Sequence, residues 1–385
     1  MKLDKKYDII FCGGGLSALI TLDKIISDNF FDNKSILVIE KNLDIIPNKT
    51  WSFWEPVNSK WNDFVTKSWD KILFKSSDIE LEKKLKDFNY KMIKSESFYR
   101  HVMAKLKSFS NIEFINENVT EVNDLVDHVI VKTDSGKFYG KKVFNSVPNE
   151  SYKSNQKFPV LLQHFEGWTI KTEKSVFNSQ TATLMDFSID QKNETRFCYV
   201  LPTNNNEALI EFTLFSKDLL KDSEYEIEIN KYIVNLGIGN FQIISKEKGI
   251  IPMTCFPFEK ENTNNIVNIG TAGGWTKPST GYTFRFIDKF SDRTIEFLKL
   301  DKSFKKFKIK NRFWFYDLIF IDVLYYNNSL GSNIFQRMFE KNKFKSIFKF
   351  LDNESRLNQE LKIIISMPNK LAFIKSFFRN ISKII

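Results

Sequence analysis

Two acidic residues stand out because their neighbours in the sequence are apolar or aromatic. Asp186 lies in Leu-Met-Asp-Phe and Glu211 lies in Leu-Ile-Glu-Phe-Thr, and both segments have the pattern of short β-strands. Burial raises the pKa of a carboxyl group, which keeps a proton available for acid catalysis near neutral pH. The alternative is that strand alternation points each acid to solvent. Asp186 and Glu211 are therefore our candidates for acid–base chemistry.

A glycine-rich turn near the N-terminus has the pattern of a dinucleotide site. An apolar strand runs into the sequence GGGLSA at residues 13–18, a helical pattern follows, and a second apolar strand ends at Glu40. In this arrangement Gly13 and Gly15 permit a tight turn and a close approach of the pyrophosphate, and the small Ala18 lets helix and strand pack together. Glu40 would accept a hydrogen bond from a ribose hydroxyl.

A second glycine-rich stretch, residues 268–284, lies between an apolar strand and a helical pattern at residues 284–300. Alone it could be an ordinary turn, but with the N-terminal motif it indicates the other half of a dinucleotide site. Glycines let the backbone approach a flat ligand, and helix N-termini attract anions such as a reduced flavin ring. We predict a helix N-terminus near Pro278 and cofactor contacts from Gly270, Gly273, Gly274, Pro278 and Gly281.

Aromatic residues gather near both glycine motifs. Four of the seven tryptophans lie between residues 51 and 69. Such a cluster forms either a corner of the core or a wall for a flat or apolar ligand. Arg100, in a helical segment, could reach the cofactor phosphates or the flavin edge, or could be a solvated helix residue. As ligand-wall residues we take Trp51, Phe53, Trp54, Trp275 and Tyr282.

Composition narrows the classes of protein. The chain has 385 residues and a formal net charge of +10, but it has no zinc-finger, RNA-recognition or arginine-rich motif, so we expect no nucleic-acid partner. The three cysteines are far apart, which fits a reducing compartment. The three histidines show no metal-ligand spacing, so we assign no metal. No apolar run is long enough to cross a bilayer, and we expect a cytoplasmic protein or one on a membrane surface.

The order of elements predicts an α/β fold, a two-domain flavoprotein with a Rossmann-type FAD-binding domain. An antiparallel β-sheet is inserted into that domain, and helices follow it. C-terminal segments such as Lys370–Ile385 interleave basic with aromatic and aliphatic residues, as in helices that lie in a membrane interface, although an ordinary packed helix fits as well. We divide the chain into FAD-binding segments at 1–75, 76–150 (with a strand excursion) and 261–300, a substrate domain at 151–260, and a helical region at 301–385.

The whole set of motifs resembles the lycopene cyclase family of carotenoid biosynthesis. The pieces that carry the resemblance include KTWSFW at residues 49–54, MDF at 185–187, IEFT at 210–213, GIIPMT at 249–254 and the stretch from Gly270 to Phe284. The N-terminal GGGLSA is shared by many flavoproteins, whereas TWSFW, IPMT and KPSTGYTF are much more specific.

This resemblance implies a lycopene β-cyclase, an intramolecular lyase or isomerase. Such enzymes convert the linear ends of lycopene into β-ionone rings, giving γ-carotene and then β-carotene, in a redox-neutral reaction that needs reduced FAD, with NAD(P)H as the expected reductant. It implies that Glu211 is the general acid and that Asp186 supports it. Because lycopene dissolves in membranes, it also implies peripheral association with the inner face of the cell membrane, and a flavin reductase or other carotenoid enzymes are possible partners.

Two positions depart from the expected patterns. Many flavin hydroxylases have Asp after the glycine of the late strand, where this chain has Thr271, and family members often have a basic residue where this chain has Ser188. A flavin monooxygenase on the same fold and a non-catalytic flavin-bearing carotenoid-binding protein remain alternatives. A halogenase is disfavoured because the sequence has no Trp-x-Trp-x-Ile motif. The number of ends cyclised, the range of carotenoids and the oligomeric state stay open.

Overall fold

The computed structural model describes residues 5–148 and 150–383. Its N-terminal sheet has the strand order β8-β2-β1-β11-β10-β9, and β17 pairs with the end of β11. The strands β8, β2, β1, β11 and β17 run parallel, and β9 and β10 are antiparallel. The strand bounds are β1 Lys6–Cys12, β2 Ile36–Glu40, β8 Ile112–Asn116, β9 Val119–Leu125, β10 His128–Thr133, β11 Lys137–Asn145 and β17 Ile266–Asn268.

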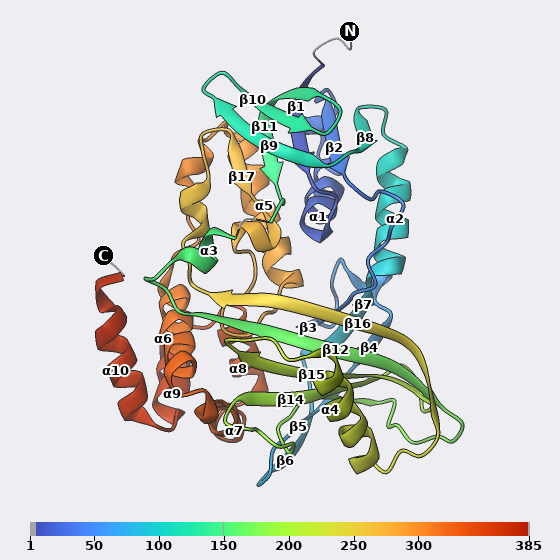
Figure 1. Ribbon diagram of the computed structural model, residues 1–385, viewed down its shortest axis with the longest axis vertical. Helices are drawn as coiled ribbons and strands as arrows, with labels where there is room; N and C mark the ends of the chain where they lie inside the picture. The colour runs from blue at the N-terminus through green and yellow to red at the C-terminus, as the bar shows by residue number, and fades with distance from the viewer. Residues whose placement is uncertain (1–4, 149, 384–385) are drawn as a thin grey trace.

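Three helices cover one face of this sheet: α1 (Leu16–Ile25), α2 (Ser95–Lys107) and α5 (Phe284–Lys299). The helices α1 and α5 touch along their length, and the buried hydroxyls of Thr21 and Ser291 are 2.8 Å apart between them. The central strands are buried on both faces, as expected for a parallel sheet. This layer is the upper part of the molecule in Figure 1.

A second sheet lies below the first, in the order β16-β12-β15-β14-β13-β5-β6. It is antiparallel except where β13 pairs with β5. One face is covered by α4 (Asp222–Asn235), and the other faces the N-terminal layer and the C-terminal helices. The strand bounds are β5 Lys71–Lys75, β6 Glu80–Lys84, β12 Val160–Thr172, β13 Thr181–Asp186, β14 Thr195–Pro202, β15 Glu207–Ser216 and β16 Phe241–Thr254.

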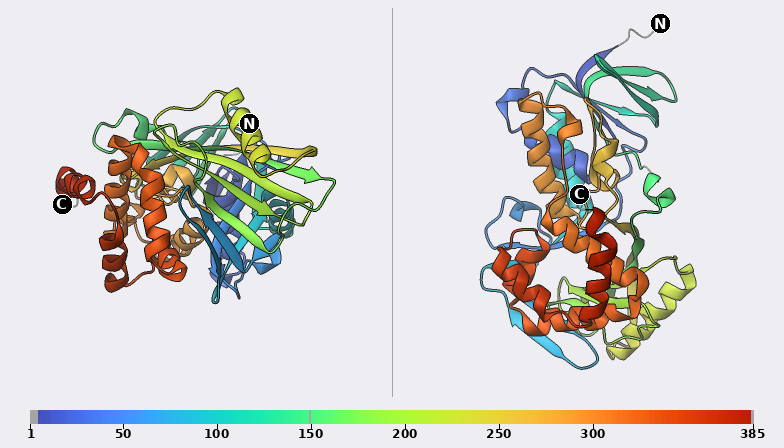
Figure 2. Two further views of the ribbon diagram at one scale, coloured as in Figure 1. Left: turned by 90° about the horizontal axis from the view of Figure 1, so that it is seen from below. Right: turned by 90° about the vertical axis from the view of Figure 1, so that its left-hand side faces the viewer.

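A small third sheet and a group of helices complete the fold. The sheet β3-β7-β4 comprises Thr50–Pro56, Phe88–Lys94 and Lys67–Trp69, and α3 is a single turn at Ser151–Ser154. The C-terminal helices pack beside one end of the second sheet (Figure 2). Their bounds are α6 Arg312–Tyr326, α7 Gly331–Lys341, α8 Phe344–Leu351, α9 Leu357–Ser366 and α10 Lys370–Asn380. In the part of the chain described, no helix is both long and apolar enough to span a bilayer.

The predicted α/β class with an inserted antiparallel sheet is confirmed, but two local expectations are wrong. The helix expected near Pro278 begins only at Phe284, because residues 278–280 form a turn and Gly281 has a positive φ of 70°. The boundary drawn after residue 75 falls between β5 and β6, which pair with each other at the edge of the second sheet. Part of the second sheet is therefore supplied by the N-terminal third of the chain.

Candidate active site

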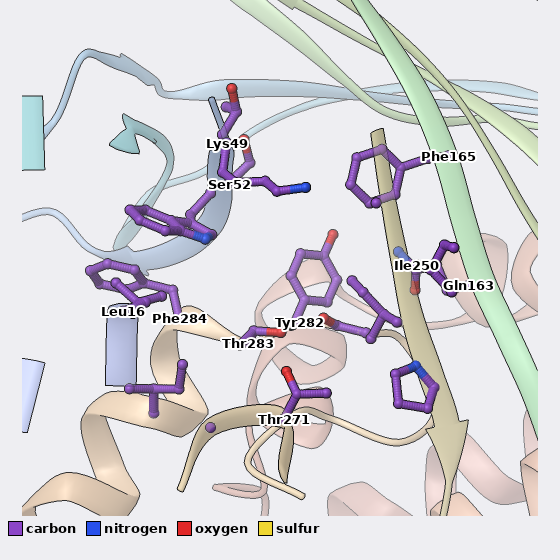
Figure 3. Close-up of a pocket in the computed structure, with 18 of the residues that line it drawn as sticks. Leu16, Lys49, Ser52, Gln163, Phe165, Ile250, Thr271, Tyr282, Thr283 and Phe284 are labelled. Carbon is purple, nitrogen blue, oxygen red and sulfur yellow. Dashed lines mark hydrogen bonds between the residues drawn. The ribbon is translucent and has the colours of Figure 1, made fainter. Parts of the chain in front are cut away.

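A cavity of about 590 Å³ lies between the two layers and reaches from the N-terminal glycine turn to the second sheet. The close-up in Figure 3 places the Tyr282 side chain between Phe284 on one side and Ile250 and Gln163 on the other. All three sheets or the segments beside them contribute to the lining. The lining residues include Gly15, Ser17, Lys49, Thr50, Trp51, Tyr90, Gln163, Phe165, Tyr199, Leu209, Glu211, Gly270, Thr271, Ala272, Thr280, Gly281, Tyr282 and Phe284.

The N-terminal turn has the geometry of a pyrophosphate cradle. Gly13 has a φ of 99°, and a Cβ there would lie 2.1 Å from the Ser146 Oγ, so only glycine fits. A Cβ at Gly15 would meet nothing within 4 Å, which leaves the approach to α1 open. No side chain caps α1, and its first N–H groups are therefore available to an anion.

Glu40, at the end of β2, accepts a hydrogen bond of 2.7 Å from the Gly14 N–H and one of 3.1 Å from the Asn42 N–H. It thus lies beside the turn, where the ribose of a dinucleotide is held in Rossmann folds. Ala18 is fully buried in the core that includes α1. These residues fit the predicted cofactor site.

The late glycine stretch closes the other side of the cavity. Gly270 has a φ of 61°, and a Cβ there would come within 2.7 Å of the Ser17 Oγ, so this turn lies directly against α1. Gly273 and Gly274 are needed for packing, since added Cβ atoms would overlap the Asn268 backbone oxygen at 2.0 Å and Phe258 at 2.7 Å. Gly270 and Gly281 line the cavity.

Three predicted cofactor residues lie elsewhere. Gly274 and Pro278 contribute to a small separate pocket and not to this cavity. Arg100 points to solvent, where it forms an ion pair of 2.9 Å with Glu96 one helical turn away. The prediction that Arg100 reaches the cofactor therefore finds no support in its position. Its helical neighbour Tyr99, which packs on Trp51, lies closer to the site.

Glu211 lies on the inner face of β15, and its side chain is partly exposed only because it lines the cavity. Burial raises its pKa to about 8, and the nearby charge of Glu247 adds to this shift. The Thr213 hydroxyl, which donates a 2.7 Å hydrogen bond to Oε1, and the charge of Lys49 act in the opposite direction. The side chain is thus a protonated carboxyl at neutral pH, in contact with the cavity.

Two tyrosines beside Glu211 were not predicted from the sequence. Tyr199 pairs directly with Glu211 across the strands β14 and β15, and Tyr90 comes from β7. Both line the cavity with Tyr282, and burial raises the pKa of each hydroxyl, that of Tyr282 to about 12. The three hydroxyls are therefore neutral. Alternation along β14 could have indicated Tyr199, but nothing in the local sequence around Tyr90 points to this site.

Of the five predicted wall aromatics, Trp51 and Tyr282 line the cavity. The other three are core residues. Phe53 stacks on Phe284 at 4.6 Å, and Trp54 stacks on Phe348 at 4.6 Å. Trp275 is fully buried against the aromatic rings of α5 and the segment after it. These three match the other interpretation of an aromatic cluster, a corner of the core.

The structure does not bring Asp186 to Glu211. Asp186 pairs with Cys198 on the face of the sheet that α4 covers, and it does not line the cavity. Its Oδ2 accepts a 2.8 Å hydrogen bond from the Tyr232 hydroxyl of α4, and its Oδ1 accepts bonds from the N–H and hydroxyl of Ser188. The expectation that it orients Glu211 is therefore replaced by a role in joining β13 to α4.

Another carboxyl group beside Glu211 belongs to Glu247 of β16. It is 7% exposed, and the Thr50 hydroxyl donates a 2.7 Å hydrogen bond to its Oε2. Glu247 was not predicted, because it lies in the polar run Ser245–Lys248, which is typical of a solvated strand. Within residues 5–148 and 150–383, no group of three or more His, Cys, Asp or Glu side chains could hold a metal ion.

The two-domain fold of flavin-dependent enzymes has three features that are all present here. They are the Rossmann layer, two glycine cradles (the N-terminal turn and the late glycine stretch), and a sheet that covers them. A geranylgeranyl bacteriochlorophyll reductase-like protein from Thermoplasma acidophilum shares this fold, with a TM-score of 0.65 and 12% identity over 99% of this chain and 100% of that chain. The flavin-dependent brominase Bmp2 has a TM-score of 0.59 and 11% identity, over 98% of this chain and 100% of that one. The p-nitrophenol 4-monooxygenase PnpA from Pseudomonas putida DLL-E4 has a TM-score of 0.57 and 11% identity, over 99% of both chains.

Within this class the sequence is more specific. Residues 8–374 match the family described as lycopene cyclase protein, and the chain belongs to that family. A search among curated proteins gave no match. The predicted family is thus confirmed across nearly the whole chain.

Proposed function

We propose that the protein is a lycopene β-cyclase that closes the linear ends of lycopene into β-ionone rings, with reduced FAD as cofactor. One observation carries this proposal: a buried carboxyl group, Glu211, shares a single cavity with both glycine cradles. A carboxyl whose pKa is about 8 is protonated at neutral pH and can act as a general acid.

The proton balance of the reaction needs only Glu211. The carboxyl proton passes to the terminal alkene of the substrate, and the tertiary carbocation formed there is attacked by the neighbouring double bond. Loss of a ring proton to the Glu211 carboxylate then restores the acid and leaves the β-ring double bond. No electron is gained or lost, so the reaction class is an isomerisation.

The cavity wall suits a cationic reaction. The rings of Trp51, Phe165 and Tyr282 line the cavity, and aromatic faces attract positive charge. The same rings exclude water, which would otherwise trap a carbocation as an alcohol. The buried hydroxyls of Tyr90 and Tyr199 are neutral and cannot take a proton from the cation.

The residues that would hold FAD are those of the two cradles. Gly13, Gly15 and the start of α1 would bind the pyrophosphate, Glu40 the ribose, and the turn at Gly270–Gly273 the flavin side. When bound and reduced, FAD would supply negative charge that stabilises the carbocation through space. NAD(P)H, directly or through a flavin reductase, would supply the electrons that keep it reduced.

A second cavity offers a route for an apolar substrate. It measures about 370 Å³, lies among α6–α10, is lined almost wholly by apolar side chains, and shares the buried Thr280 with the lining of the first cavity. Ile364, Ile374 and Phe377 line it and are also exposed on the surface. An extended polyene with one end at Glu211 could place its remainder here.

We also propose peripheral association with the cytoplasmic face of the membrane, through the outer surface of α9 and α10. This surface exposes a set of large apolar side chains, with lysines at 362, 370 and 375 beside them. Such a surface combines apolar burial with attraction to anionic lipid. The exposed apolar residues are Leu361, Ile364, Ile365, Leu371, Ile374, Phe377 and Phe378.

Co-expression with a lycopene-producing pathway tests the proposal, with wild type and Glu211→Gln compared. We expect β-carotene from the wild type, and lycopene with retained flavin from the variant. Purified protein with lycopene and NAD(P)H should show product formation without stoichiometric consumption of NAD(P)H or oxygen. Hydroxylated product with such consumption would instead identify a monooxygenase, and bound but unchanged lycopene would identify a carrier.

A further inference from the structure

The register of the second sheet places four residues in one row across neighbouring strands. Tyr199 of β14 pairs with Glu211 of β15, Glu211 pairs with Gly167 of β12, and Gly167 pairs with Glu247 of β16. Residues that pair directly across strands point to the same face. Glu211 and Glu247 therefore flank Gly167 on the inner face of the sheet.

Gly167 has no side chain between Glu211 and Glu247, and the Leu209 side chain packs over it, with its Cδ1 3.0 Å from where a Cβ would lie. A Cβ at this position would lie 3.4 Å from the Cβ of Glu211 and 3.3 Å from the Cγ of Glu247. The adjacent strands are each about 4.8 Å apart, so the two side chains extend over the glycine from both sides. No other side chain of β12 stands in this row.

Glu247 is held in place from outside the second sheet, because its Oε2 accepts the hydrogen bond from Thr50 of β3. Burial raises the pKa of Glu247, and the bond from Thr50 and the positive charges of Lys49 and Lys94 act in the opposite direction. Its Oε1 is buried and accepts no hydrogen bond. Glu211, on the cavity side, meets the like charge of Glu247.

The remaining charged groups near this strand belong to the other face. Lys248 pairs with Glu166 and Asp222, and Lys246 pairs with Glu226 of α4. These ion pairs are satisfied on the outer face of the sheet. The charged groups that face Glu247 from the elements packed on it are thus Glu211, Lys49 and Lys94.

We propose that Glu247 is a positioning residue whose negative charge, placed across Gly167, keeps the proton on Glu211 until the substrate takes it. The proposal rests on the assignment of Glu211 as the acid. It requires no further reactant, because Glu211 alone gives and regains the proton. The reaction would thus depend on a pair of carboxyl groups with separate tasks.

The Glu247→Gln variant tests this proposal, because the amide keeps the size and the bond from Thr50 but removes the charge. The upper limb of the pH–rate profile should move down by about one pH unit. Glu166→Gln is the matched control: it also replaces a fully buried carboxyl in this sheet, but on the outer face, where Trp168 and Lys248 bind it. In the Glu166→Gln variant, the upper limb of the pH–rate profile should stay at the wild-type pH.

A measurement without substrate separates this proposal from the proposed function. Infrared titration of the protonated carboxyl band in the FAD-loaded protein should show a band, absent in Glu211→Gln, that disappears at lower pH in Glu247→Gln than in wild type. An unchanged midpoint in Glu247→Gln, or an equal shift in Glu166→Gln, would overturn the role of Glu247. A shifted midpoint in a protein that does not cyclise lycopene would uphold the carboxyl pair and reject the cyclase.

Discussion

At the scale of single residues, the environment of Glu211 sets a pH limit on the reaction. Since burial and Glu247 raise its pKa to about 8, the acid is protonated below that pH and ionised above it. We expect the rate with pre-reduced flavin to be level from pH 6 to 7.5 and to fall tenfold per unit at higher pH. Glu211→Gln should lower it by about 10²-fold or more. A rate that stays level beyond pH 9 would contradict this assignment.

The same residue links stability to pH. The folded pKa of about 8 lies above the ordinary value of 4.5, so the folded protein holds the proton more tightly than the unfolded chain. Its contribution to stability is complete below about pH 4.5 and is lost as the pH rises to 8. As the pH rises from 5 to 9, the melting temperature of the wild type should therefore fall relative to that of the Glu211→Gln variant. Thermal scans across this range measure the difference.

Asp186 offers a contrast, because its bonds are structural. Asp186→Asn weakens the hydrogen bonds from Tyr232 and Ser188, which should cost about 1–3 kcal/mol of unfolding free energy. Turnover per folded, flavin-loaded molecule should remain near that of wild type. Tyr232→Phe is the matched control and should lower stability without a change in turnover. Loss of turnover in Asp186→Asn but not in Tyr232→Phe would indicate that Asp186 takes part in catalysis.

At the scale of elements, the turn between β1 and α1 is predicted to control cofactor binding. Gly13→Ala adds a Cβ 2.1 Å from the Ser146 Oγ at a φ that L-residues avoid, so the turn must open. We expect purified protein with little flavin absorbance and weakened FAD affinity. Gly136→Ala, in an open turn between β10 and β11, is the control and should retain flavin.

The pair α9–α10 makes a separate prediction. Replacing Leu371 and Phe378, 74% and 70% exposed, with Ser removes apolar surface without touching the core. Flotation with vesicles that contain anionic lipid should show binding weakened about tenfold or more, and high salt should weaken wild-type binding. Val234→Ser on α4, also 70% exposed, should bind as wild type. An equal loss of vesicle binding in both variants would show that the α9–α10 surface is not the part of the protein that binds the membrane.

At the scale of the whole molecule, a buried ion pair joins the cofactor layer to the C-terminal helices. Lys277, in the loop before α5, lies 2.8 Å from Asp317 of α6, and both side chains are buried. Asp317→Asn leaves the Lys277 charge unpaired and should cost about 3 kcal/mol or more in denaturant unfolding. The double variant Lys277→Met/Asp317→Leu should recover most of this loss. A single variant as stable as wild type would show that the two layers are held by apolar packing alone.

The secondary-structure elements and the family follow from local patterns along the chain. Glycine spacing, apolar strands and the TWSFW and KPSTGYTF pieces are local patterns, so the Rossmann layer, the strands β12–β15 and the family could be identified from them. The local pattern around Glu211 was also enough to single out this residue. Each of these patterns involves residues only a few positions apart in the chain, so it can be recognised without the tertiary structure.

Which side chains meet depends on contacts between segments that are distant in the sequence. Tyr90 and Gln163 line the cavity from strands distant in the sequence, and Glu247 lies across Gly167 from Glu211, whereas Asp186, which shares the apolar setting of Glu211, faces α4. The reason is that a strand's register decides which face a residue occupies, and a shift of one position reverses it. Register depends on pairing between segments far apart in the chain, and for this reason the carboxyl pair across Gly167 could not be found from the sequence.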